Sequence, residues 1–200
     1  MSTTRDTEDV STGTTSRHVP GEPGLWVLLF GDMALFTFLF TFYLHDRGQN
    51  PRLFAESQEH LHRTIGVINT LVLLTSSIFV VFALRALRNE HMRQLATRLA
   101  VAAIAIGACF IVLKLFEYYE LVTAGMTLTS NDFYMWYFAI TALHLGHVVL
   151  GLLTLTVLTR LVRSAKTAAT HMAFFEGGAC FWHVVDLLWI VIFPLLYLVR

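Results

Sequence analysis

Charged residues are scarce in this sequence. Only 14% of its 200 residues are Asp, Glu, Lys or Arg, whereas soluble domains have about a quarter. Basic and acidic residues number 14 each, so the formal net charge is zero and gives no argument for a nucleic-acid partner. The mean hydropathy of +0.62 and the 56% share of hydrophobic residues indicate an integral membrane protein.

Cysteine is also rare, and the signatures of several enzyme classes are missing. Cys109 and Cys180 both lie inside apolar runs and form neither a CxxC motif nor a secreted disulfide pattern, which leaves the redox compartment open. The sequence has no GxSxG, HExxH or CxxCH motif. We therefore expect no catalytic centre in this chain.

The N-terminal segment, residues 1–22, is rich in Ser and Thr and poor in large apolar groups. Such a segment cannot bury a core, so it is predicted to be a disordered cytoplasmic tail. No short apolar region with a small-residue cleavage site follows it, and we expect the first apolar segment to be retained as an anchor.

Five long apolar segments follow, at residues 24–45, 65–87, 98–122, 133–160 and 172–198. About 20 helical residues cross the hydrocarbon core of a bilayer. The sequence therefore predicts an all-α fold, an integral membrane bundle of five transmembrane helices formed by residues 23–200.

Basic residues are distributed unevenly among the connections. They are Arg85, Arg88, Arg93 and Arg98 between the second and third segments, and Arg160, Arg163 and Lys166 between the fourth and fifth. The connection between the third and fourth segments has none. This bias predicts a cytoplasmic N-terminus and an external C-terminus. Trp26, Trp136 and Tyr137 then fall near span ends, where aromatic rings favour the interface.

The apolar segments contain several polar and ionisable side chains. The last one, FFEGGACFWHVVDLLWIVIF (174–193), has three, although an Asp at bilayer depth costs about 2.5–3.5 kcal/mol on insertion scales. The full set of candidates for a buried polar network is Asn69, Lys114, Glu117, His144, His147, Glu176, His183 and Asp186, to which the proton-path candidate Asp32 is added.

Depth along the spans, at about 1.5 Å per residue, suggests which of these groups meet. Asp32 is expected to bond with His144 or His147, and Lys114 with Asp186. Residues three apart share a helix face, so each span is predicted to present one polar stripe to the bundle interior or to a partner.

Three interpretations of these groups compete. Histidines on facing helices can bind haem or a metal ion, but the residues favour histidines bonded to carboxylates, and we expect no metal site. Asp32 can belong to a proton path, or it can be a neutral carboxyl bonded to a neighbouring helix. A stand-alone proton-coupled channel or transporter is a further alternative, although the sequence has no internal repeats.

Three motifs carry a family resemblance. They are GACFIVLKLFEYYE (107–120), ITALHLGHVVLG (140–151) and FFEGGACFWHVVDLLWIVIFPLLY (174–197). In order and spacing they resemble the last three helices of cytochrome c oxidase subunit III. LLFGDMALFTFLFTFYL and NTLVLLTSS resemble earlier helices of that family more loosely, so the resemblance covers about residues 22 to 200.

The resemblance implies a non-redox accessory subunit of a haem-copper terminal oxidase. It implies a role in assembly, proton uptake and sustained turnover of an aerobic respiratory complex in a prokaryotic inner membrane. The partner is then a catalytic subunit I-like membrane protein that binds the haem and copper, together with the other subunits of the complex. Membrane lipids are further partners, including a bound phospholipid.

The sequence departs from the family in three ways. Asp32 stands where the family has a buried glutamate, and Lys114 stands where the residue is commonly neutral. The two leading helices of the seven-helix form are missing, and with them one wall of the family's lipid-holding cleft. The opening GEPGLWVLLFGDM also resembles the branch associated with nitric oxide reductases, so that a nitric oxide reductase is the alternative partner.

Overall fold

The computed structural model describes residues 23–164 and 168–199. The tail predicted at residues 1–22 and the basic Lys166 lie outside the described residues. The elements are α1 (Pro23–Gln49), α2 (Pro51–Glu59), α3 (Arg63–Leu87), the 3₁₀ turn η1 (Glu90–Met92), α4 (Arg93–Thr123), α5 (Asp132–Ser164), α6 (Ala168–Phe193) and the π-helical turn η2 (Pro194–Leu198). No strand occurs in this part of the chain.

Five of these helices are long and apolar enough to cross a membrane. The candidate spans are Trp26–Gln49, Arg63–Leu87, Arg93–Thr123, Asp132–Leu161 and Phe174–Leu198. The prediction of an all-α bundle of five transmembrane helices is therefore confirmed, and the chain is a multi-pass membrane protein.

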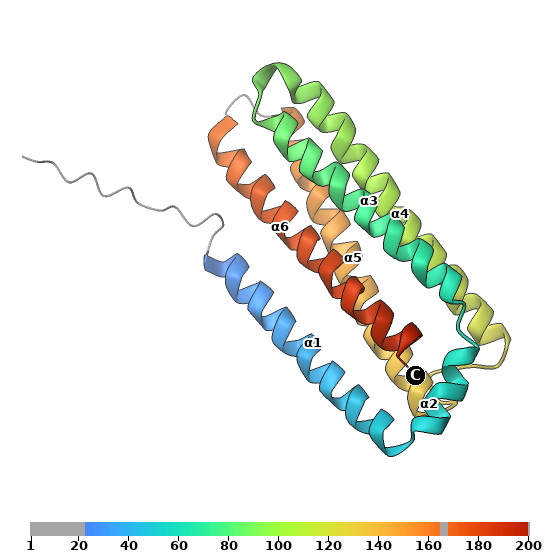
Figure 1. The fold of residues 1–200 in the computed structure, drawn as a ribbon. Helices are drawn as coiled ribbons and strands as arrows, with labels where there is room; N and C mark the ends of the chain where they lie inside the picture. The colour runs from blue at the N-terminus through green and yellow to red at the C-terminus, as the bar shows by residue number, and fades with distance from the viewer. Residues whose placement is uncertain (1–22, 165–167, 200) are drawn as a thin grey trace, which may run out of the picture.

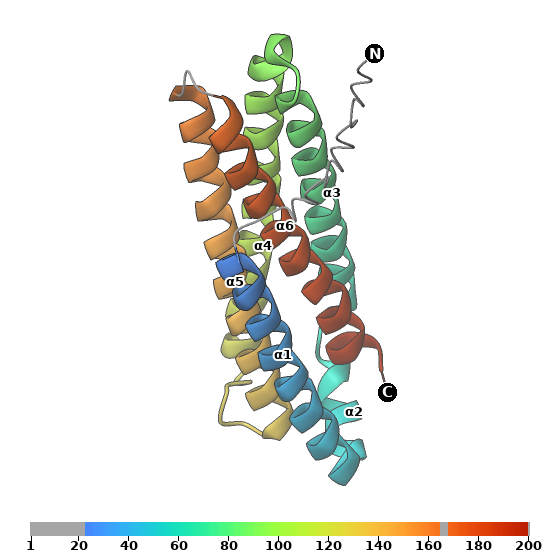
Figure 2. The same cartoon turned by 90° about the vertical axis from the view of Figure 1, so that its left-hand side faces the viewer.

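The helices are unevenly packed. The α3 and α4 helices form a close antiparallel hairpin, α6 packs against α3 and α5, and α1 lies along α5 and α6 on the opposite side of the bundle from that hairpin (Figures 1 and 2). Half of the most apolar stretch of α6 is buried, against 17% in α1. The core therefore lies among α3 to α6, and α1 is a peripheral helix.

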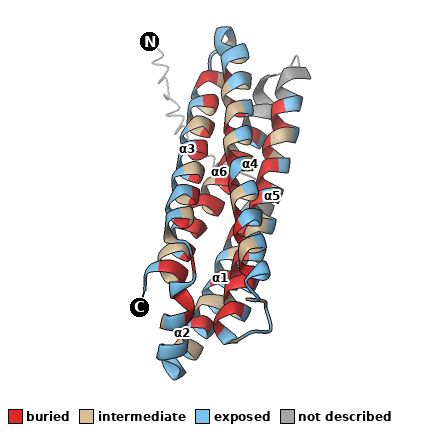
Figure 3. Cartoon of the chain, turned by 90° about the vertical axis from the view of Figure 1, so that its right-hand side faces the viewer, coloured by how far each residue is buried: buried red, intermediate tan, exposed pale blue. Residues whose placement is uncertain are grey.

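Small residues allow this core to close, and buried positions follow one side of each helix (Figure 3). The Ser76 hydroxyl donates to the carbonyl of Ala103, 2.8 Å away, across the α3/α4 contact. Gly107 and Gly151 face the indole of Trp182, and a Cβ at Gly151 would come within 2.7 Å of that ring. Close approach of this kind is how membrane helices gain packing energy without a hydrophobic driving force.

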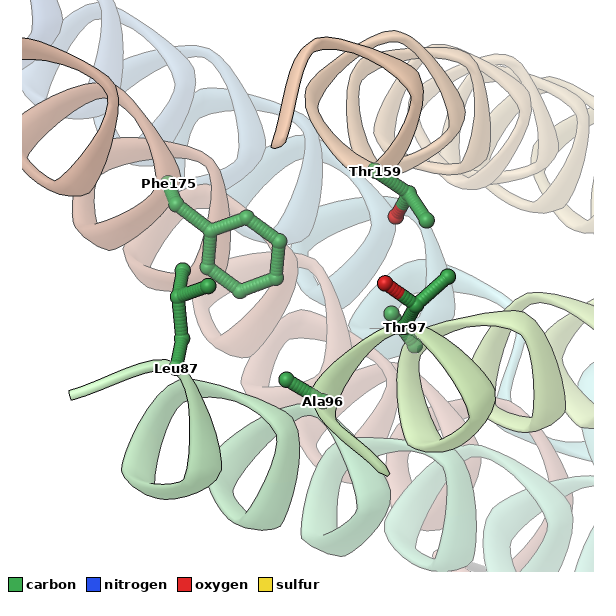
Figure 4. Close-up of a pocket in the computed structure, with 6 residues that line it drawn as sticks. Leu87, Ala96, Thr97, Thr159 and Phe175 are labelled. Carbon is green, nitrogen blue, oxygen red and sulfur yellow. The ribbon is translucent and has the colours of Figure 1, made fainter. Parts of the chain in front are cut away.

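The two ends of the bundle differ in how they close. At the end where α3 meets α4, a cavity of about 10 Å³ lies between the helices, lined by Leu87, Ala96, Thr97, Ala100, Thr159 and Phe175 (Figure 4). A water molecule needs about 10–15 Å³ of such space. The space between α3, α4, α5 and α6 at this end is therefore too small for a ligand larger than a water molecule.

At the other end, α2 covers the last turn of the α6 segment. Pro194 cannot donate a backbone hydrogen bond, and the chain continues as a wider π turn. The last carbonyls of a helix lack intrahelical donors. Here the Gln58 amide donates to the carbonyl of Leu196 at 3.0 Å, and the Tyr43 hydroxyl donates to that of Leu195 at 3.3 Å. The α2 helix and the last part of α1 thus each provide one donor to the carbonyls of η2.

Candidate functional site: buried polar groups between the helices

The most deeply buried charges are an ion pair on α4. The Lys114 Nζ lies 2.9 Å from Oε2 of Glu117, one turn further along the helix. The side chains are 0% and 2% exposed. An uncompensated charge at this depth costs several kcal/mol, so the pair needs further partners.

Two tyrosines provide those partners. Lys114 Nζ donates to the hydroxyls of Tyr197, at 2.8 Å, and Tyr137, at 3.1 Å. Because an ammonium group has three donors, Glu117, Tyr137 and Tyr197 use all of them. The Tyr197 hydroxyl in turn donates to Oε1 of Glu117 at 2.6 Å. These four residues, which we term the α4 cluster, are electrically neutral as a group and join α4, α5 and η2.

The expected pairing of Lys114 with Asp186 is wrong. Lys114 bonds within the α4 cluster, whereas Asp186 lies one turn after His183. The His183 Nδ1 is 2.6 Å from the Ser77 hydroxyl, which places this side of α6 against α3. The two groups have similar depth but face different neighbours, since depth along a span does not determine rotation about its axis.

His144 is buried in aromatic surroundings. Its ring stacks on Trp189 with centroids 5.3 Å apart and meets Phe110 edge-on at 5.7 Å. Neither ring nitrogen has a hydrogen-bond partner among residues 23–164 and 168–199. The Asn69 side chain on α3 is likewise buried without a partner within the described part of the chain.

Asp32 pairs with the second of its two expected partners. Its Oδ1 lies 3.2 Å from Nε2 of His147, and Nδ1 of His147 lies 2.8 Å from the Leu143 carbonyl. The carbonyl can only accept, so Nδ1 carries a proton and Nε2 faces the carboxyl. The Asp32–His147 contact then needs one further proton, which either residue can hold. The side chains are 17% and 14% exposed, so this pair is less deeply buried than Lys114 and Glu117.

Glu176 differs from the expectation that it belongs to the buried network. It lies in the first part of α6 and accepts a hydrogen bond from Arg88 Nη2 at 3.3 Å. The side chains are 29% and 64% exposed. Glu176 therefore joins the end of α3 to the start of α6 near the loops, apart from the groups at mid-span.

Sequence analysis missed part of the site. Tyr137 was expected at the interface but is fully buried, while its neighbour Trp136 donates to Asp46 at 2.7 Å. One signal could have revealed Tyr137, because it lies four residues before Thr141 and seven before His144, on one helix face. Tyr197 had no such signal, since its position depends on the turn that starts at Pro194.

Metal binding gets no support from the geometry of these side chains. Within residues 23–164 and 168–199, no group of three or more His, Cys, Asp or Glu side chains is placed to hold a metal ion.

The chain is thus a helical membrane protein of five spans in which several ionisable side chains bond to other helices. The model of the family described as cytochrome c oxidase subunit III matches residues 22–199. The chain belongs to the cytochrome c oxidase subunit III family.

Named relatives agree with this family. The chain is 31% identical to "Cytochrome c oxidase subunit 3" of Synechocystis sp., over 96% of this chain and 86% of the relative. It is 27% identical to "Cytochrome bo(3) ubiquinol oxidase subunit 3" of Buchnera aphidicola subsp. Baizongia pistaciae, over 88% of this chain and 89% of the relative. It is also 29% identical to "Heme-copper oxidase subunit I+III" of Aeropyrum pernix, over 88% of this chain but 22% of that longer protein.

Proposed function

We propose that this chain is a non-redox accessory subunit of a haem-copper terminal oxidase and supports assembly, proton uptake and sustained turnover. The observation that carries the proposal is the family match over residues 22–199. The hydrogen bonds that join the buried Lys114–Glu117 pair to tyrosines of α5 and η2 agree with it, because such bonds stabilise a bundle and need no substrate. Haem and copper belong to the partner catalytic subunit.

The partner is a subunit I-like membrane protein. The Aeropyrum relative supports this part of the proposal, since its name joins subunits I and III in one chain and this sequence matches only 22% of it. Two domains of a fused protein are held close together, which is the arrangement expected of separate subunits that form one complex. The names of the relatives include both cytochrome c and ubiquinol oxidases.

Asp32 is the residue that we assign to proton uptake. The Asp32–His147 contact needs one mobile proton, is partly exposed and lies on the peripheral helix α1. Those three properties suit a group that exchanges protons with its surroundings. The other candidates, Asn69, Lys114, Glu117, His144, Glu176, His183 and Asp186, are assigned to structure, because they are closed inside the bundle or pair at its end.

The chain is proposed to lie in a prokaryotic cytoplasmic membrane with its N-terminus in the cytoplasm. Residues 1–22 then form a cytoplasmic tail, and residues 23–200 the five-helix domain. The basic end of the α3/α4 hairpin supports this orientation, since Arg and Lys are enriched in cytoplasmic loops.

Purification of the full-length chain from its own membrane tests the proposal. We expect a haem-containing partner to co-purify, and its optical spectrum and oxygen consumption to identify a terminal oxidase. Isolation without any haem protein, together with ion flux by the lone chain in liposomes, would establish the channel alternative. Nitric oxide reduction without oxygen consumption would identify the other type of partner.

The Asp32→Asn substitution tests the role of α1 in the purified complex. The variant keeps the size and a hydrogen bond but cannot release the proton, so we expect normal subunit content and a shorter turnover lifetime. Thr37→Val is a matched control on the same helix, because the Thr37 hydroxyl is exposed and only bonds the Met33 carbonyl of its own helix. Equal lifetimes for wild type and Asp32→Asn would refute the proton role.

A further inference from the structure

Helix α1 is attached to the bundle along a single line of side chains. Its buried residues within the described part of the chain are Leu29, Phe36 and Tyr43, which are seven residues apart and therefore lie on one helix face. Most other large apolar side chains of α1 are exposed, and the helix runs along the side of the bundle away from the α3/α4 hairpin (Figure 1). Because this contact is narrow, the position of α1 depends on a small number of polar bonds.

The two halves of α1 are held by different bonds. At the end next to α2, the Trp136 indole donates to Asp46 at 2.7 Å, and the Tyr43 hydroxyl donates to the Leu195 carbonyl at 3.3 Å. Neither donor loses its proton near neutral pH. Toward Pro23, the Asp32–His147 contact is the only side-chain bond from α1 to another helix among the described residues. One half of α1 is therefore anchored independently of pH, and the other half by an ionisable pair.

The Asp32–His147 contact is a hydrogen bond only while it holds its proton. Because Nδ1 of His147 donates to the Leu143 carbonyl, Nε2 faces the carboxyl of Asp32. With one proton between them the two groups form a hydrogen bond, and the pair has no net charge. Without that proton a nitrogen lone pair faces a carboxylate, so the bond is lost and a negative charge is left inside the span. Release of the proton thus breaks the polar attachment of this half of α1.

The other ionisable side chains near this part of the bundle have other neighbours. Those inside the helices that pack against α1 and α5, away from the loops, are His144 on α5, Lys114 and Glu117 on α4, and Glu176, His183 and Asp186 on α6.

Lys114 and Glu117 pair with each other, and His144 lies between aromatic rings. On α6, the bonds of Glu176 and His183 lead toward α3, and Asp186 follows His183 by one turn. The charged residues of α2 lie at the anchored end of α1. Within the described residues, no hydrogen bond or ion pair ties any of these groups to the Asp32–His147 contact, which therefore depends on its own proton.

We propose that α1 is a hinged helix whose docking is controlled by this proton. It pivots about its anchored end near Tyr43 and Asp46. Its other half lies against α5 while the Asp32–His147 contact holds the proton, and moves away from α5 when the proton leaves. This inference rests on the proton exchange assigned to Asp32 in the proposed function, and it gives that exchange a conformational output.

Distances between α1 and α5 test the hinge. Residue 32 meets residue 147 and residue 46 meets residue 136, so the two helices run antiparallel. Nitroxide labels at Val27 and Leu153, which are both exposed and at similar levels, report on the hinged half. Labels at Leu44 and Met135, also exposed, are the matched pair at the anchored end.

The measurement is double electron–electron resonance on the purified complex in lipid nanodiscs, with Cys109 and Cys180 of this chain replaced by Ala. One hydrogen bond contributes about 1 kcal/mol net, which corresponds to about a fivefold change in an equilibrium. Between mildly acidic and mildly alkaline pH, we therefore expect the ratio of short to long Val27–Leu153 distances to fall about fivefold. The Leu44–Met135 distance is expected to stay the same.

Substitutions at Asp32 assign the movement to its proton. In Asp32→Asn the side-chain amide donates to Nε2 of His147 and has no proton to release, so we expect the short distance at every pH. Asp32→Leu forms no bond, so the long distance is expected to be enriched at every pH. Thr37→Val is the matched control on α1 and should keep the pH response of the wild type, because the Thr37 hydroxyl bonds only within its own helix.

A Val27–Leu153 distance that does not change with pH in the wild type would overturn the proposal. Persistence of the pH response in Asp32→Asn would also overturn it, and equal changes at both label pairs would exclude a hinge. The turnover lifetime of Asp32→Asn is measured separately. A shortened lifetime together with an immobile α1 would refute the hinge and leave the proposed function standing.

Discussion

The α4 cluster and the Asp32–His147 pair both hold ionisable side chains inside the membrane-spanning bundle, but they differ in how those side chains are covered and paired. In the α4 cluster, Lys114 and Glu117 are almost fully covered and every donor of the ammonium group has an acceptor. Asp32 and His147 are partly exposed, and they join the core to a helix with little buried surface. The first arrangement fixes three elements to one another, whereas the second is the partly exposed pair to which we assign proton exchange.

The largest effect is expected from breaking the α4 cluster. Lys114→Met leaves Glu117 charged and uncompensated in the core, which costs about 3–5 kcal/mol when one member of a buried pair is removed. We expect the chain to be lost from the purified complex, as measured by subunit content.

The double variant Lys114→Met with Glu117→Gln is the control. It removes both charges while nearly preserving volume, so much of the lost subunit should return, as replacing a whole buried pair is often neutral. Recovery no better than in the single variant would show that the cluster stabilises through more than charge balance.

A smaller effect is expected from the packing beside the cluster. Gly151→Ala places a Cβ within 2.7 Å of Trp182, and overpacking of this kind costs about 1–3 kcal/mol. Gly146→Ala on the same helix is the control, because a Cβ there meets nothing within 4 Å. Reversible unfolding in mixed micelles should show destabilisation by the first variant alone, and similar curves for both would contradict the packing of Trp182.

The Asp32–His147 pair should contribute less to stability than the α4 cluster or the packing at Gly151. A double-mutant cycle with Asp32→Asn and His147→Ala should give a coupling energy of about 1 kcal/mol or less, because the contact is a single, partly exposed hydrogen bond. The unfolding free energies of the four proteins give this value. A coupling as large as that of the α4 cluster would remove the contrast between the two regions.

The smallest effect is expected at the loops. Arg88→Gln removes the ion pair with Glu176, whose members are largely in reach of water, and should cost under about 1 kcal/mol. The loss should shrink at high salt because exposed charges are screened. Unfolding curves at two ionic strengths check this, and a salt-independent loss would point to a packing role for Arg88.

The sequence allowed the five spans to be predicted, since hydropathy and length alone define them. It did not reveal α2, which has nine residues, is amphipathic and is stabilised by contacts with η2. The predicted polar residues include Lys114 and Glu117 of the α4 cluster, but the two tyrosines were missed and the pairing was only partly predicted. Depth placed Asp32 near His147 correctly, yet it also suggested Asp186 for Lys114, because the rotation of each helix is fixed by packing that the sequence does not display.

The α4 cluster also imposes an order on membrane insertion. Tyr197 follows Glu117 by 80 residues, so α4 is synthesised well before this hydroxyl exists. Until then, Lys114 and Glu117 have each other, one turn apart on the same helix, as partners made within α4 itself. Their spacing therefore lets α4 enter the lipid bilayer with its two charges paired. Tyr137 and Tyr197 add their hydrogen bonds to the pair after the later spans have been inserted.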